Sequence, residues 1–107
     1  RGLKTDWHKA FYWYEKAANA GNPNAQNNLG LLYENGQGVS KNLKKAAKLY
    51  RLSAEQGFHS AQFNLALSYY YGSGVKKSKK EAIKWFRRAA EQGNKDAATN
   101  LRILLKK

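Results

Sequence analysis

Few side chains in this chain combine the residue types and the spacing that catalysis or metal binding requires. His8 and His59 are its two histidines, and neither has a second ligand at metal-binding spacing. The chain contains no cysteine, which excludes thiolate metal sites, cysteine nucleophiles and a disulfide framework. Glu55 and Glu91 have no partner carboxylate with which to form a general acid–base pair. The sequence therefore predicts no enzymatic activity, no metal and no cofactor.

The segment Gly72-Ser73-Gly74 contains enough glycine to suggest a phosphate-binding loop. Such a loop ends in Gly-Lys-Ser/Thr and follows a strand, whereas this segment lacks that ending and follows a helical pattern. Glycine in the left-handed conformation also closes helices. We therefore interpret this segment, and the similar Gly36-Gln37-Gly38, as helix ends.

Basic side chains form a charged pattern that recurs. Lys and Arg number 20 against 7 Asp and Glu, a net charge of +13. Six of them lie at i, i+4 and i+7 of two predicted helices: Lys44, Lys48 and Arg51, then Lys80, Lys84 and Arg87. The pattern indicates either solvated charge or a convex surface for an acidic protein, nucleic acid or acidic lipid. The corresponding positions His8, Tyr12 and Glu15 interrupt it, which disfavours nucleic acid.

A repeat of 36 residues positions these side chains. The segment AQNNLGLLYENGQGV, Ala25 to Val39, recurs as AQFNLALSYYYGSGV, Ala61 to Val75, and in shortened form from Ala97. Within each copy, apolar residues recur at the spacing of two amphipathic helices. The sequence predicts an all-α solenoid of antiparallel two-helix repeats, with helices at 6–20, 23–35, 42–56, 59–71, 78–92 and 95–106.

The repeat boundaries divide one domain, 1–107, into four pieces: a half repeat at 1–21, repeats at 22–57 and 58–93, and a terminal helix at 94–107. Gly2-Leu3 align with Gly38-Val39, so we expect further helical sequence before residue 1. Gly30 and Ala66 share one repeat position, where a small residue lets a following helix approach closely. Arg102 stands at the same position in the last predicted helix. We therefore expect the stack to end at the last helix.

Three motifs carry a family resemblance: A-x-x-x-L-[GA]-x-x-Y, G-x-G-V and K-A-x-x-[WL]-[YF]-x-x-[SA]-A-E-Q-G. Together they resemble the Sel-one-like repeat, a branch of the tetratricopeptide repeat superfamily, over nearly the whole chain. The resemblance implies a right-handed superhelix whose first helices line a concave groove. It also implies an adaptor that assembles protein complexes, often in bacterial settings. The absence of cysteine excludes the disulfide-linked members of the family.

Carrying the repeat pattern onto this chain gives a set of candidate groove residues on the first helices: Asn27, Asn28, Leu31, Glu34, Asn35, Phe63, Asn64, Leu67, Tyr70, Tyr71, Thr99, Ile103 and Lys106. Phe63, Leu67 and Tyr70 form a second apolar stripe, which either packs between first helices or binds a partner. Asn28, Asn64 and Asn100 share one repeat position and bond either a ligand backbone or a neighbouring repeat.

These observations predict an interaction scaffold that binds a protein or peptide in its groove. The alternative is an anionic partner bound by the basic convex face. No apolar run is long enough to cross a bilayer. Cytoplasmic, periplasmic and secreted locations all remain open.

Overall fold

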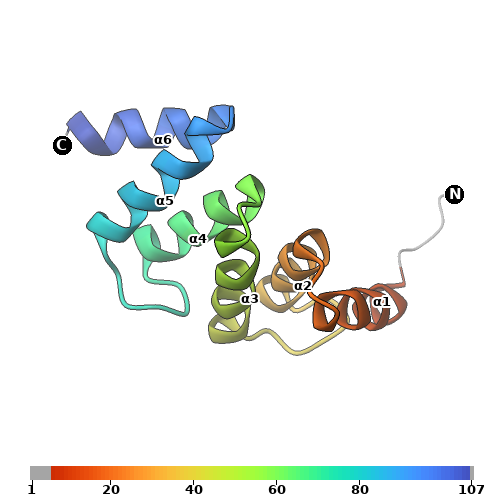
Figure 1. Cartoon of the computed structure of the whole chain (residues 1–107). Helices are drawn as coiled ribbons and strands as arrows, with labels where there is room; N and C mark the ends of the chain where they lie inside the picture. Colours follow the sequence, from red (N-terminus) through yellow and green to blue (C-terminus); the bar gives the residue numbers. More distant parts are fainter. Residues whose placement is uncertain (1–5, 107) are drawn as a thin grey trace, which may run out of the picture.

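The computed structural model describes residues 6–106, and within this range the chain forms six helices and no strand. They are α1 (Trp7–Asn19), α2 (Pro23–Asn35), α3 (Leu43–Glu55), α4 (His59–Tyr71), α5 (Lys79–Glu91) and α6 (Lys95–Lys106). Each helix packs against the next in chain order, so that the pairs stack into a solenoid (Figure 1). The predicted helix ranges agree with these bounds to within one residue. The predicted alignment of Gly2-Leu3 lies outside the described residues.

Hydrogen-bonding side chains begin the second helix of each repeat, as the sequence predicts. Asp6, Asn42 and Ser78 each accept a hydrogen bond from a backbone N–H in the first turn of α1, α3 and α5. Phe58 precedes α4 and supplies no such bond. At the other end of the first helices, Gly36 and Gly72 adopt the left-handed conformation that closes α2 and α4.

Close packing between the helices of one repeat depends on small residues in the first helix. The ring of Tyr50 lies against Gly30, where an added Cβ would approach the Tyr50 Cε1 atom to 2.7 Å. Ala66 stands at the same position in the next repeat and is fully buried with Phe86. Arg102 takes this position in α6 and is exposed. The predicted role of the small residue is therefore confirmed by the contact at Gly30.

One prediction about the core is wrong. Trp13 and Trp85 share a repeat position, and the i, i+3, i+4, i+7, i+8 spacing of apolar residues at 10–18 and 82–90 predicts that both lie on a buried stripe. Trp85 is only 1% exposed, because α5 packs against α4, the helix before it. Trp13 is 61% exposed, because within residues 6–106 no helix precedes α1. Burial at this position thus depends on the neighbouring helix and not on the residue type.

The second glycine of each Gly-x-Gly segment has a role that helix termination does not explain. A Cβ on Gly74 would collide with the carbonyl oxygen of Leu43, at the start of α3. Gly38 lies in the same way against the carbonyl of Trp7, at the start of α1. The loops after α2 and α4 therefore touch the backbone of the preceding repeat directly, and only glycine leaves room for this contact.

None of the helices described here is long and apolar enough to cross a membrane.

Candidate partner-binding face

A hollow of about 350 Å³ opens between α2, α3 and α4. Polar side chains form most of its lining, and several of them come from the ends of the helices and from the loops that follow. The lining residues are Glu34, Asn35, Lys41, Leu43, Asn64, Leu67, Ser68, Tyr71 and Ser73. We refer to it as the polar hollow.

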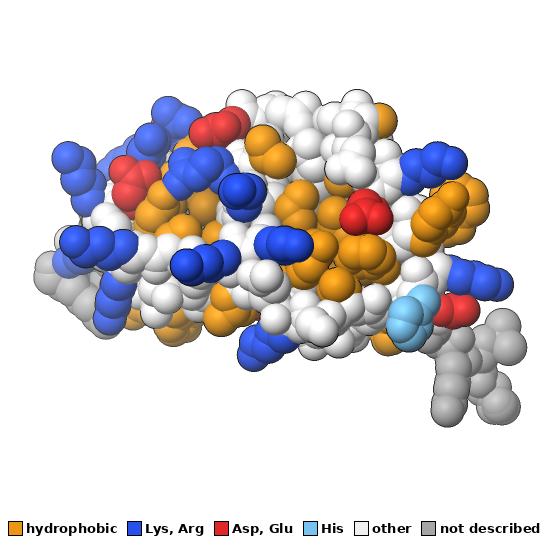
Figure 2. Space-filling model, turned by 90° about the horizontal axis from the view of Figure 1, so that it is seen from below, with side chains coloured by type: hydrophobic (Ala, Val, Ile, Leu, Met, Phe, Trp, Pro, Cys, Tyr) orange, Lys and Arg blue, Asp and Glu red, His pale blue; other side chains and the backbone are white. Residues whose placement is uncertain are grey.

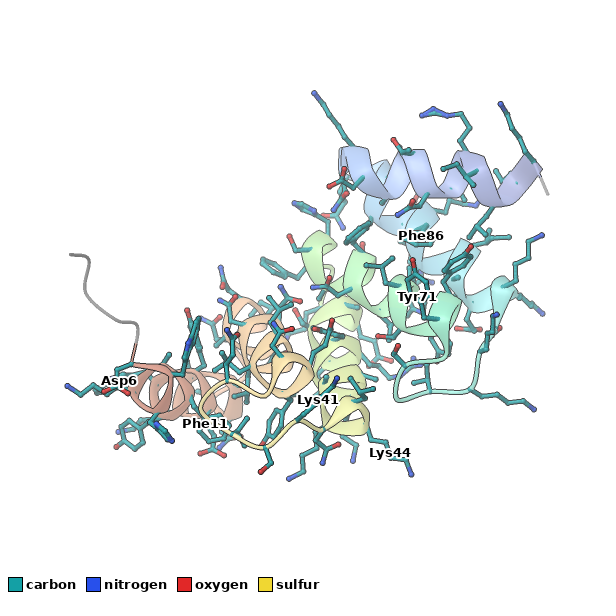
Figure 3. All side chains as sticks on the ribbon, turned by 180° about the vertical axis from the view of Figure 1, so that it is seen from behind. Asp6, Phe11, Lys41, Lys44, Tyr71 and Phe86 are labelled. Atoms are coloured by element: carbon teal, nitrogen blue, oxygen red, sulfur yellow. The ribbon has the colours of Figure 1, made fainter. Side chains whose placement is uncertain are left out.

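A second hollow, of about 170 Å³, lies between α4, α5 and α6. Its lining is mainly apolar and aromatic, and we refer to it as the apolar hollow. The lining residues are Leu67, Tyr70, Tyr71, Phe86, Asn100, Ile103 and Leu104. Leu67 and Tyr71 line both hollows, so the two adjoin, and Figure 3 shows Tyr71 between Phe86 and Lys41.

The structure brings together part of the predicted groove. Seven of its residues line one or both hollows: Glu34, Asn35, Asn64, Leu67, Tyr70, Tyr71 and Ile103. Leu31 and Phe63 pack against the core, and the Phe63 ring centroid lies 5.9 Å from that of Phe86. Asn27 is buried, whereas Thr99 and Lys106 are exposed on α6. In the second apolar stripe, Phe63 therefore packs between helices, whereas Leu67 and Tyr70 line the apolar hollow.

The three asparagines that share a repeat position have three different environments. The Nδ2 atom of Asn64 donates to the Oδ1 atom of the buried Asn27 at 2.9 Å, which joins α4 to α2. The Nδ2 atom of Asn28 donates within its own helix, to Asn24 at 2.6 Å. Asn100 lines the apolar hollow and makes no side-chain hydrogen bond to another described residue. Among the three, Asn100 is thus the one whose whole side-chain amide makes no hydrogen bond to another described residue and can bond a ligand.

Two charged side chains line the polar hollow. The hydroxyl of Tyr50 donates to the Oε1 atom of Glu34 at 2.5 Å, which fixes this carboxylate at the α2–α3 boundary. Burial, reinforced by the Glu34 carboxylate, raises the pKa of Tyr50 far above its ordinary value. Lys41 comes from the loop after α2 and forms no ion pair with another described residue. The hollow therefore presents opposite charges to a ligand.

The basic residues predicted for the convex face differ in their solvent exposure and in the interactions of their side chains. Lys44, Lys48, Lys80, Lys84 and Arg87 are exposed. The Lys84 Nζ atom lies 5.2 Å from the centroid of the Trp85 ring. Arg51 is held in place: its guanidinium lies over the Tyr69 ring, donates to the Tyr69 hydroxyl and pairs with Glu55 at 3.8 Å. Figure 2 shows basic side chains crowding the half of one face nearer to α6.

Several lining residues were not among the sequence-based groove candidates. Lys41 and Ser73 lie in loops, where helical periodicity gives no information about direction. Ser68 and Leu104 fall on the predicted core side, and only the packed structure shows that they border a hollow. The described residues contain no cluster of acidic or histidine side chains that could hold a metal ion.

The family model of the Sel1 repeat matches this chain three times, at residues 1–22, 23–58 and 59–94. The chain belongs to the Sel1 repeat family. A Sel1 repeat protein from Oxalobacter formigenes has a similar structure, with a TM-score of 0.87 and 43% identity over 94% of this chain and 41% of its own. A protective antigen of uropathogenic Escherichia coli with an SLR fold gives a TM-score of 0.88 and 42% identity, over 90% of this chain and 21% of its own.

Among curated proteins, the chitin synthase regulator SKT5 of Saccharomyces cerevisiae is 47% identical over 46 residues, which are 43% of this chain and 7% of that protein. The chain thus spans less than half the length of each of these three relatives. Sel1 repeat proteins are generally non-enzymatic scaffolds for protein–protein interaction. The family and the solenoid fold predicted from the sequence are therefore confirmed.

Proposed function

We propose that this chain binds a protein or peptide partner across the two adjoining hollows. The observation that carries this proposal is Tyr71, which is 68% exposed and, together with Leu67, lines both hollows. Binding energy at protein interfaces concentrates on aromatic side chains beside well-formed pockets. A partner that covers Tyr71 would remove this ring from water and fill both hollows together.

The lining indicates what such a partner carries. Leu67, Tyr70 and Ile103 give the apolar hollow a surface for one aliphatic or aromatic side chain. The amide of Asn100, which has no hydrogen-bond partner among the residues that the structure describes, supplies a donor and an acceptor for the backbone of an extended peptide. In the polar hollow, Lys41 offers an acidic side chain an ammonium group that forms no ion pair within residues 6–106. The partner segment would thus have an apolar residue beside a carboxylate.

A peptide selection tests this proposal. Random peptides displayed on phage would be selected against the wild-type chain, and their dissociation constants would then be measured for single variants. We expect Tyr71→Ala and Ile103→Ala each to weaken binding by about 1–3 kcal/mol, or roughly 5- to 150-fold in Kd. Both side chains are about half exposed or more, so thermal unfolding should change little.

The matched control is Leu52→Ala, which removes an apolar side chain that is 47% exposed and lines neither hollow. Its Kd should equal that of the wild type. Selected peptides that bind all three variants as tightly as the wild type would show that the hollows are not the binding face.

A further inference from the structure

Positive charge is distributed unevenly along this chain. Residues 76–107 contain 11 of the 20 Lys and Arg but only 3 of the 7 Asp and Glu, so they carry +8 of the net +13. This segment includes the end of the loop after α4, all of α5 and all of α6.

Lysines of two helices and one loop extend this charge over a surface. Lys44 and Lys48 lie one turn apart on α3, and Lys80 and Lys84 lie one turn apart at the same repeat positions on α5. Lys76 precedes α5, and all five side chains are exposed. We refer to these five residues as the lysine face. None of them forms a hydrogen bond or an ion pair with another described residue, and none lines either hollow.

Two of these lysines occupy positions that are unfavourable for helix stability. Lys44 and Lys80 lie in the first turns of α3 and α5, where the helix dipole presents positive potential and disfavours cations. The first turn of α3 contains no acidic residue to compensate, whereas that of α5 contains Glu81. Local rules of stability are broken most often where a surface serves a function. This argues that the lysine face binds an anion-rich partner.

We propose that the lysine face binds the surface of a membrane that contains acidic phospholipids. The ammonium groups come from two separate helices at equivalent repeat positions and not from one continuous row, and charges spread in this way fit a plane of phosphates better than the single track of a nucleic acid strand. Exposed side chains of α3 and α5 include no aromatic ring on which bases could stack. The five lysines carry compact charges that suit diffuse attraction to a charged surface. The exposed Arg87 continues the α5 row by one turn, whereas the corresponding Arg51 of α3 is held against Tyr69.

This assignment is independent of the two hollows. Because the lysine face and the hollows share no residue, a membrane-bound chain can still hold a protein partner. Figure 3 shows Lys44 projecting away from the body at the start of α3, whereas Tyr71 lies at the end of α4. A scaffold held in this way would concentrate its protein partner at a membrane.

Cosedimentation with lipid vesicles tests the proposal. The probes are vesicles of phosphatidylcholine with and without phosphatidylserine, at roughly physiological salt. The wild-type chain should sediment only with the vesicles that contain phosphatidylserine, and less as salt rises. A test variant replaces four residues of the face with Gln: Lys44, Lys48, Lys76 and Lys80. Each lysine contributes about fivefold to vesicle partitioning, so the variant should bind on the order of 10²- to 10³-fold more weakly.

The control variant removes the same net charge elsewhere, by replacing Lys9, Lys16, Lys95 and Lys106 with Gln. These four residues are exposed and lie on α1 and α6. The control variant's loss of vesicle binding should be at least tenfold smaller than that of the test variant. Circular dichroism should show that both variants are folded. Equal losses would mean that net charge alone drives binding and would overturn the proposal. Failure of the wild type to sediment, or tighter binding to a single-stranded oligonucleotide than to the vesicles, would also overturn it.

Discussion

Replacing Trp85 by Ala tests the account of the core, because the chain contains a matched tryptophan at the same repeat position. A tryptophan side chain buries roughly 150–250 Å². At about 25 cal/mol per Å², burying this area stabilises the fold by roughly 4–6 kcal/mol. The Nε1 atom of Trp85 is buried without a hydrogen-bond partner among the described residues, which offsets about 1 kcal/mol of this gain. We therefore expect Trp85→Ala to lower the free energy of unfolding by about 3–5 kcal/mol.

Trp13→Ala is the control. Trp13 is 61% exposed, so the same area calculation gives a loss of at most about 2 kcal/mol. Its ring lies 5.8 Å from the Lys16 Nζ atom, a contact worth about 0.5–1 kcal/mol at an exposed site and included in that limit. The free energy of unfolding of both variants would be measured by urea unfolding, with helix content followed by circular dichroism at about 222 nm. Equal losses, or a loss below about 1 kcal/mol for Trp85→Ala, would refute the packing described here.

Three further predictions follow from single contacts. Gly30→Leu should lower stability by more than about 2 kcal/mol in urea unfolding, because the side chain would overlap the Tyr50 ring, whereas Arg102→Leu at the same repeat position should be nearly neutral. Since the pKa of Tyr50 is raised in the folded state, the contribution of Tyr50 to stability is complete below about pH 10 and is lost as the pH rises further. Tyr50→Phe should therefore flatten the plot of unfolding free energy against pH above about pH 10, and an unchanged slope would contradict this. Asn64→Ala leaves the buried Asn27 without its donor and should cost about 1–3 kcal/mol by thermal unfolding; a loss near zero would show that this hydrogen bond contributes nothing.

The sequence predicts the helices well because their signals are local. Asp6, Asn42 and Ser78 mark helix starts at one repeat position, and Gly36 and Gly72 mark helix ends. Each signal acts through backbone groups within a few residues, so periodicity and capping rules identify it without knowledge of the tertiary structure. The six helix ranges follow from these signals.

The candidate site is predicted less completely because it depends on how the helices are offset from one another. Phe63 and Tyr71 both belong to the predicted groove, yet one ring packs against Phe86 and the other is 68% exposed. Asn64 and Asn28 share a repeat position, but the partner of Asn64 is set by the distance between α2 and α4. No pattern along a single helix contains that distance.

The contact between each loop and the preceding repeat has a consequence for how such chains vary. At Gly74 and Gly38 the loop touches carbonyl oxygens at the starts of α3 and α1, and a carbonyl oxygen is present whatever side chain its residue carries. The spacing between successive repeats is therefore set by contacts between main-chain atoms, which are the same in every repeat that has this glycine. Side chains on the outer surfaces can then change from one repeat to the next, as His8, Lys44 and Lys80 do at one position, without altering the rise of the stack. Such a chain can acquire new surfaces while its framework keeps the same geometry.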